Sequence, residues 1–237
     1  MTCLVILNLE IKMKTINIDK KYKTPSSGAF LSSVKTLSKC CKISSLKATN
    51  YLQGEDSYTR RKPRRTKFRR RRVMVPGIDH LWQADICFLP RYTSSNNGFS
   101  FLVTVIDVFS KYAFAVPMKS KKSKEVIRAF TSIFDSTSRR PKCLECDQGT
   151  EFWCKAFVNW IASHGVKMYH NYSDFGACVV ERFNRTICTK ISKYLTLTGQ
   201  KTYINILPAI VKSYNSSVHS RTNMSPDKIN KYNEMDV

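Results

Sequence analysis

The sequence predicts an α/β layer fold built on a mixed sheet, and two observations favour that class. Apolar runs rich in β-branched and aromatic residues at 80–89 and 99–106, then a shorter one at 112–116, are typical of an antiparallel meander. From residue 123 to residue 170, amphipathic helical patterns alternate with short apolar strands. Strands followed by such an alternation indicate one sheet covered by helices.

The net charge is the feature of the composition that bears most directly on function. Of the 237 residues, 40 are Lys or Arg and 17 are Asp or Glu, which leaves +23. This surplus suits a phosphate-rich polymer whose counterions are released on binding, so nucleic acid is the expected partner. No apolar run approaches the ~20 residues of a membrane-spanning helix, which argues against a membrane protein. We recognise no secretion signal and expect a nuclear protein, or a cytoplasmic one before import.

Residues 1–59 are predicted to form a small helical N-terminal region, since the chain is long enough for one large core and a satellite unit. We assign no function to residues 1–24. Apolar residues recur at helical spacing in 26–39 and again in 44–53, where Gly54 is a plausible stop. The two helices can form a helix-turn-helix, either as a packing unit or as a reader of the DNA major groove.

A basic linker is predicted for residues 60–74. Its first thirteen positions, 60–72, hold ten cations and one proline, so self-repulsion opposes a helix. This density favours a strap that contacts phosphates and also serves as a nuclear-import signal, whereas the alternative is a solvated tail. The predicted DNA contacts in the run are Arg60, Arg61, Arg64, Arg65, Arg69, Arg70, Arg71 and Arg72.

Residues 75–237 are predicted to form the main domain. After the three-stranded meander, Ser123 is predicted to cap a helix whose apolar residues fall at i, i+1, i+4, i+7 and i+8. A short strand at 142–146 places Asp147 at its tip. A helix that buries Phe157, Trp160 and Ile161 follows, then a strand at 166–170 and a loop at 171–176.

A long helix is predicted from about Ala177 to Leu197, with two different faces. One face carries Glu181, Asn184, Arg185 and Cys188, and the other carries the apolar residues Val180, Phe183, Ile187, Ile191 and Tyr194. Glu181 is the only acid between Asp174 and Asp227. It indicates metal or phosphate chemistry, or else it is a solvated carboxylate paired with Arg185 four residues on.

Three carboxylates stand out by position: Asp85 in the first strand, Asp147 after the fourth, and Glu181 on the long helix. Acids on three separate elements converge only through folding. Three buried carboxylates repel one another unless cations hold them, and the cation suited to oxygen ligands and phosphate chemistry is Mg²⁺ or Mn²⁺. The pattern therefore favours two-metal phosphoryl transfer.

These residues lie in motifs that resemble the retroviral-type integrase core over about residues 75–230. The matching segments, in the family's order, are Trp82-Gln-Ala-Asp85, Val105-Ile-Asp-Val-Phe-Ser-Lys-Tyr112, Asp147-Gln-Gly-Thr-Glu151-Phe152, Val180-Glu-Arg-Phe-Asn-Arg-Thr186, and the late set Tyr214-Asn215, His219 and Ser225-Pro226. Two upstream segments, 54–59 and 72–77, are similar to those of integrases from Polinton or Maverick elements and related transposon-derived genes.

The resemblance implies an RNase H-like three-layer core with a five-stranded mixed sheet, preceded by a small helical segment. It implies DNA integration by a DDE-type polynucleotidyl transferase: water nicks a DNA end, and the freed 3′-hydroxyl attacks target DNA. Asp85, Asp147 and Glu181 match the catalytic acids that hold two Mg²⁺ or Mn²⁺ ions, and Asn184 and Arg185 match positions that face DNA. The family also suggests a homo-oligomer, a dimer or larger.

Of the other motif acids, we expect a strand-end turn role for Asp107 and a helix cap for Glu151.

The sequence departs from the family pattern in three places. The spacing Gln148–Val180 is shorter than is common in the family, and we place the shortfall in the loop at 171–176. The upstream zinc module of retroviral integrases has no matching set of His and Cys, so no zinc is predicted. The sequence ends at Val237, where relatives continue into a small C-terminal DNA-binding domain. The sequence leaves open whether this chain is a fragment, a decayed copy or a domesticated gene. Two alternative functions also stay open: an inactive, nucleic-acid-binding remnant and a nuclease without strand transfer.

Overall fold

A five-stranded mixed sheet forms the centre of the computed structural model, which describes residues 17–61, 73–147, 149–170 and 177–237. The strand order is β3-β2-β1-β4-β5. Strands β1, β2 and β3 pair antiparallel, whereas β4 pairs parallel with both β1 and β5. The predicted meander and the predicted mixed sheet are both confirmed. The strands are β1 (Leu81–Phe88), β2 (Phe101–Asp107), β3 (Ala113–Met118), β4 (Cys143–Cys146) and β5 (Lys167–His170).

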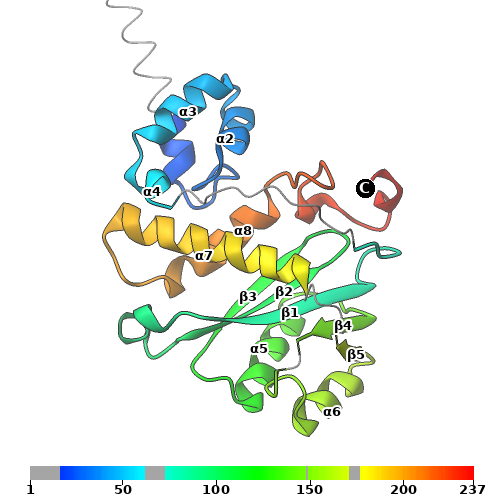
Figure 1. Cartoon of the computed structure of the whole chain (residues 1–237). Coiled ribbons are helices and arrows are strands. Elements are labelled where there is room, and N and C mark those ends of the chain that lie inside the picture. The colour runs from blue at the N-terminus through cyan, green and yellow to red at the C-terminus, as the bar shows by residue number, and fades with distance from the viewer. Residues whose placement is uncertain (1–16, 62–72, 148, 171–176) are drawn as a thin grey trace, which may run out of the picture.

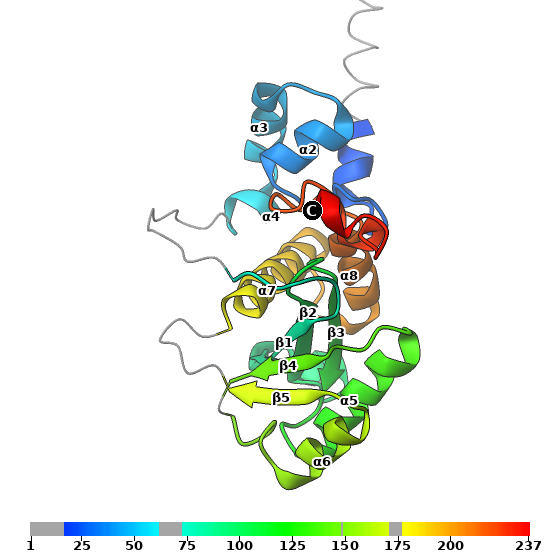
Figure 2. The same ribbon diagram turned by 90° about the vertical axis from the view of Figure 1, so that its right-hand side faces the viewer.

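Helices cover both faces of this sheet, as Figures 1 and 2 show from two sides. On one face lie α5 (Ser123–Ser136) and α6 (Lys155–Ser163), and on the other α7 (Cys178–Thr198) and α8 (Leu207–Asn215). Because side chains alternate along a strand, β1 turns Trp82 and Ala84 toward α5 and α6. The same alternation leaves Gln83 and Asp85 for the α7 face, where both bond to that helix.

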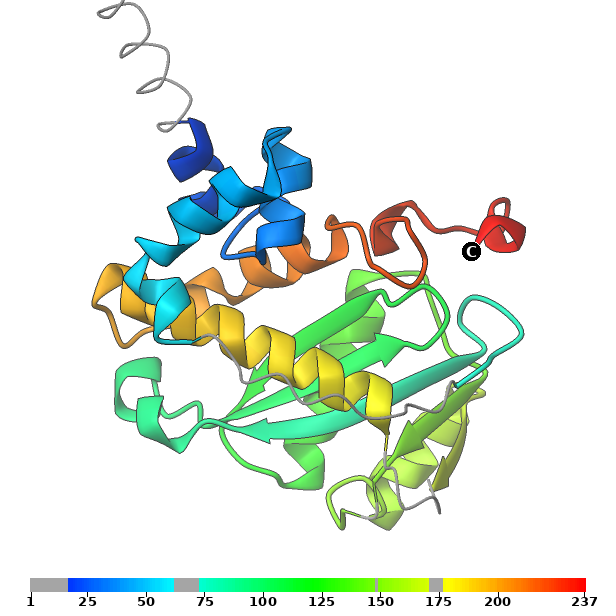
Figure 3. The ribbon, with the colours of Figure 1, turned by 45° about the horizontal axis from the view of Figure 1, so that its top comes forward.

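The N-terminal region packs on α7 and α8, on the side away from the sheet (Figure 3). Residues 17–23 are helical, and α2 (Val34–Cys41), α3 (Ser45–Gln53) and α4 (Asp56–Thr59) follow. This region shares one apolar cluster with α7 and α8. The small region therefore has no separate core of its own within the described residues. Four residues of the N-terminal region are fully buried in this cluster: Tyr22, Phe30, Leu37 and Leu52.

Three predictions about helix starts are wrong, and in two of them another residue supplies the cap. The helix expected from residue 26 begins at Val34, after a turn, and Ser33 caps it by accepting the N–H of Thr36 at 3.4 Å. Ser123 is the first helical residue rather than the cap. Glu151 does not cap α6, because Cys154 accepts the N–H of Phe157 instead, at 3.4 Å.

Two buried lysines on α7 hold the N-terminal region in place. Lys190 Nζ donates to the carbonyl oxygen of Phe30 at 2.6 Å, and Lys193 Nζ donates to that of Leu31 at 3.2 Å. Burial lowers the pKa of Lys190 to about 7, with a further contribution from the charge of Lys193. Burial also lowers the pKa of Lys193 to about 8. Helical periodicity alone did not predict that either lysine is buried.

Because both lysines have lowered pKa values, we expect the free energy of unfolding to increase with pH. Between about pH 7 and the unfolded pKa of 10.5, the unfolded chain holds a proton that folded Lys190 has released, so the free energy of unfolding rises with pH. The slope is about 1.4 kcal/mol per pH unit for each such group. Urea denaturation at pH 7.5 and 9.5 should show a gain about 2 kcal/mol smaller in Lys190→Met than in the wild-type protein. Exposed Lys212→Met is the control, and an equal gain in all three proteins would contradict the buried, deprotonated lysine.

None of the helices in the described residues combines the length and the apolar character that crossing a bilayer requires.

Candidate active site

Asp85 is the half-buried acid of the site. Its Oδ1 accepts the backbone N–H of Ile86 at 2.7 Å, and its Oδ2 accepts Nδ2 of Asn184 on α7 at 2.6 Å. The hydroxyl of Thr104 on β2 donates to Oδ1 of the same Asn184 side chain at 2.5 Å. The amide of Asn184 therefore fixes the Asp85 carboxylate between the sheet and α7. The predicted contact of Asn184 with DNA stays a prediction, and its contact with Asp85 is a second role that the sequence did not indicate.

Asp147 lies beside Asp85 because of the strand register. Ala84 of β1 pairs with Cys146 of the parallel strand β4, so the next residue on each strand is one of the two acids. Burial raises the pKa of Asp85, and the negative charge of Asp147 raises it further, while the cation of Lys121 lowers it. Asp147 is itself exposed, and one oxygen of its carboxylate accepts the N–H of Gly149 at 3.2 Å. The sheet thus brings two of the three predicted acids together.

Glu181 lies in the first turn of α7, which Gln83 attaches to β1. The Oε1 atom of Gln83 accepts the backbone N–H groups of Val179 and Val180 at 3.0 and 3.1 Å. Its Nε2 donates to Glu145 Oε2 on β4 at 2.8 Å. Gln83 therefore sets the position of the helix that carries Glu181. The only sequence signal for this role is that Gln83 precedes Asp85 by two residues and so shares its strand face.

The three acids do not form one closed group. Within the described ranges, no set of three His, Cys, Asp or Glu side chains is arranged so that it can hold a metal ion. Glu181 is exposed, and the ion pairs of the described residues include none between it and Arg185, the partner that the solvated alternative required. Mutual repulsion among three carboxylates favours such separation. The role of Glu181 as a metal ligand stays a prediction.

The carboxylates of Asp85 and Asp147 fit a divalent metal by their chemistry. Both supply hard oxygen ligands of the kind that Mg²⁺ and Mn²⁺ prefer, and they come from adjacent strands. A cation next to them would also favour the ionised form of Asp85, which burial and Asp147 disfavour.

The basic residues predicted to contact DNA are described only in part. Arg60 pairs with Asp56 at 2.5 Å, and Arg61 is exposed at the end of the same helical segment. Arg185 is exposed on α7. The remaining arginines of the run, from Arg64 to Arg72, and the loop at 171–176 lie outside the described residues.

The two other motif acids have structural contacts. Asp107 is fully buried, where it accepts the Ser110 N–H at 3.1 Å and Arg139 Nη2 at 2.7 Å, and this confirms its predicted turn role. Glu151 pairs with Lys121 at 3.3 Å. Lys121 also lowers the pKa of Asp85, so this ion pair borders the two acids.

Comparison with known proteins supports one family over part of the chain. Residues 77–173 match the family model described as integrase core domain. A putative uncharacterized transposon-derived protein of Caenorhabditis elegans, F54H12.3, is 31% identical over 138 residues, which are 58% of this chain and 48% of that protein. The retrovirus-related Pol polyprotein from transposon 297 of Drosophila melanogaster is 28% identical over 54% of this chain and 12% of the polyprotein. The chain thus spans less than half the length of either relative.

Solved structures show the same fold at low sequence identity. A chain from the structure of the simian T-cell lymphotropic virus intasome in complex with PP2A regulatory subunit B56 gamma aligns with 83% of this chain. The alignment covers 70% of that chain, with a TM-score of 0.57 and 20% identity. The HTLV-2 integrase catalytic core domain in complex with magnesium aligns over 67% of this chain and 99% of that chain, with a TM-score of 0.54 and 22% identity.

Proposed function

We propose that this chain, which carries an integrase core domain of RNase H-like fold, catalyses polynucleotidyl transfer on DNA. The proposed reaction has two steps: water cleaves a DNA end, and the freed 3′-hydroxyl attacks a phosphodiester of a second DNA. The observation that carries the proposal is the pair Asp85 and Asp147, one half-buried and one exposed, which the register of two adjacent parallel strands places side by side. A net charge of +23 supports DNA as the substrate.

The proposed roles follow from the positions of the side chains. Asp85 and Asp147, together with Glu181, would hold two Mg²⁺ or Mn²⁺ ions. When bound, such ions activate the attacking oxygen and stabilise the leaving one. Asn184 holds the Asp85 carboxylate in place at 2.6 Å, and Gln83 holds the helix that carries Glu181. Arg185, exposed on the same helix, would contact the DNA near the acids.

Assembly and location are part of the same proposal. HTLV-2 integrase core structures have been solved in a trimeric and a dimeric form, which supports a homo-oligomer here. The basic run at 60–72 supports import into the nucleus.

The test is incubation of the protein with labelled duplex ends in Mg²⁺ or Mn²⁺. Joined products would support the transferase, shortened ends alone would identify a nuclease, and retarded but intact DNA would identify a binding remnant. Glu181→Gln should lower joining at least about 100-fold, the upper cost found for groups that merely support metal ligands. It should leave DNA affinity nearly unchanged.

A matched control removes one carboxylate elsewhere. Asp135→Asn changes an exposed acid on α5, on the opposite face of the sheet, and should join DNA at the wild-type rate. If Glu181→Gln also retains the wild-type rate in Mg²⁺, Glu181 is not part of the site.

A further inference from the structure

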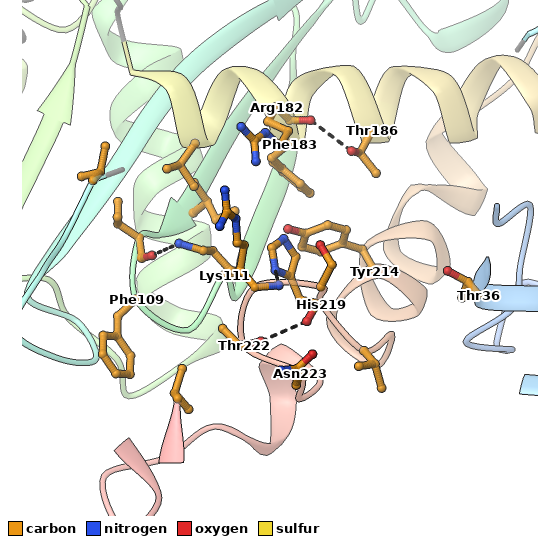
Figure 4. Close-up of a pocket in the computed structure, with 18 of the residues that line it drawn as sticks. Thr36, Phe109, Lys111, Arg182, Phe183, Thr186, Tyr214, His219, Thr222 and Asn223 are labelled. Atoms are coloured by element: carbon orange, nitrogen blue, oxygen red, sulfur yellow. Dashed lines mark hydrogen bonds between the residues drawn. The ribbon is translucent and has the colours of Figure 1, made fainter. Parts of the chain in front are cut away.

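A cavity beside the first turns of α7 has none of the three candidate acids among its lining residues. It has a volume of about 890 Å³ and opens between α2, the turn from β2 to β3, the first turns of α7 and the segment 218–223 (Figure 4). Elements far apart in the sequence thus meet around one space. Figure 4 shows Lys111, Arg182, His219 and Tyr214 directed toward it from three of these elements and from α8.

The charged side chains that line this cavity all have the same sign. Lys111, Arg182 and Arg221 come from three separate segments, and α2 adds Lys35 and Lys39. No Asp or Glu side chain is among the lining residues. Of the ion pairs within the described part of the chain, none includes Lys111, Arg182 or Arg221. The side chains that line the cavity therefore concentrate positive charge.

The other cations of the cavity affect the pKa of Lys111. Burial lowers the pKa of Lys111, and the charges of Arg182 and Arg221 lower it further. Asp107 acts in the opposite direction, but its carboxylate is buried and already accepts Arg139 Nη2 at 2.7 Å. An anion placed among the three cations would relieve their repulsion.

His219 adds a neutral hydrogen-bond donor. Burial, followed by the three cations, lowers the pKa of His219 to about 4, so the ring is neutral at neutral pH. The backbone N–H of Arg221 donates to Nδ1 at 3.2 Å, which leaves the proton on Nε2. Cations together with a neutral N–H donor form the set that recognises a phosphate oxygen better than a carbonyl or an amine.

We propose that this cavity binds a phosphate group of the DNA backbone, with Lys111, Arg182 and Arg221 as its charge partners and His219 as a neutral donor. The inference deepens the proposed function, because it states where one strand of the substrate lies. Arg182 directly follows Glu181 on α7, about 100° around the helix. A strand held here would therefore pass the N-terminus of the helix that also presents Glu181.

The test compares the double variant Arg182→Gln/Arg221→Gln with the wild-type protein in the presence of EDTA, so that no catalysis intervenes. Both arginines are exposed, and removing like charges should leave the melting temperature equal or higher. The affinity for a short duplex is measured over a range of salt concentrations. The log-log slope should flatten by roughly 0.9 for each lost phosphate contact. The control, Arg91→Gln/Lys228→Gln, removes two exposed cations outside the cavity and should change the slope less.

Inorganic pyrophosphate is the probe for the alternative source of the anion. It should raise the melting temperature of the wild-type protein and not that of the cavity variant. Equal slopes in the cavity and control variants would overturn the inference. If pyrophosphate still protected only the wild-type protein in that case, the cavity would bind a free anion and not the DNA backbone, while the joining assay would still decide the proposed reaction. A flattened slope in a protein that never joins DNA would refute the proposed reaction and leave this binding site standing.

Discussion

Asp147→Asn is expected to abolish DNA joining and, at the same time, to remove the rise in melting temperature that Mn²⁺ gives the wild-type protein. Asp85 and Asp147 follow paired residues on β1 and β4, and the charge of Asp147 disfavours ionisation of half-buried Asp85. A divalent cation that Asp85 and Asp147 help to hold would stabilise the folded state by RT ln(1 + [L]/Kd). Removing the charge of Asp147 removes that gain, and joining should fall by about 10³-fold or more, as when one electrostatic group of an active site is lost.

The measurement is a melting curve with and without Mn²⁺ at neutral pH, next to the joining assay. Metal-free Asp147→Asn should melt at the wild-type temperature or above it, because one repulsive charge has gone. A variant that were merely misfolded would melt earlier. Exposed Asp227→Asn should respond to Mn²⁺ as the wild-type protein does. Identical metal responses of Asp147→Asn and the wild-type protein would refute a paired-carboxylate metal site and favour the binding remnant.

Asp107→Ala should strongly lower the free energy of unfolding. The Asp107 carboxylate is fully buried and accepts Arg139 Nη2 at 2.7 Å, the Ser110 hydroxyl at 2.5 Å and the Ser110 N–H at 3.1 Å. Its removal leaves Arg139, whose side chain is 19% exposed, with Asp79, also at 2.7 Å, as its one remaining ion-pair partner among the described residues. Breaking a buried pair from one side costs about 3–5 kcal/mol. Urea denaturation measures this loss.

The double variant Asp107→Ala/Arg139→Met separates the ion pair from the turn. Removing both partners leaves no uncompensated charge, so the double variant should be more stable than Asp107→Ala alone. A loss below about 1 kcal/mol in Asp107→Ala, the range of exposed ion pairs, would show that the buried pair contributes little.

Local patterns were sufficient to predict most of the elements. Strand alternation and helical periodicity predicted the five strands, α5, α6 and α7, and the buried face of α7 at Val180, Phe183, Ile187 and Ile191. Helix starts were less well predicted, since Ser33 and Cys154 cap helices for which an earlier start or another residue was expected. Caps depend on single hydrogen bonds, which periodicity does not report.

By itself, the sequence determined the α/β class, the excess of positive charge and the identity of the candidate acids, because these depend on residue types and short-range spacing. The tertiary structure decided which groups meet. Strand register set Asp85 beside Asp147, Gln83 attached α7 to the sheet, and the packing of α7 against the N-terminal region buried Lys190. It also gathered Lys111 and its neighbouring cations around one cavity. Those contacts join residues that are distant along the chain. They arise from long-range packing and strand register, which local sequence patterns do not report.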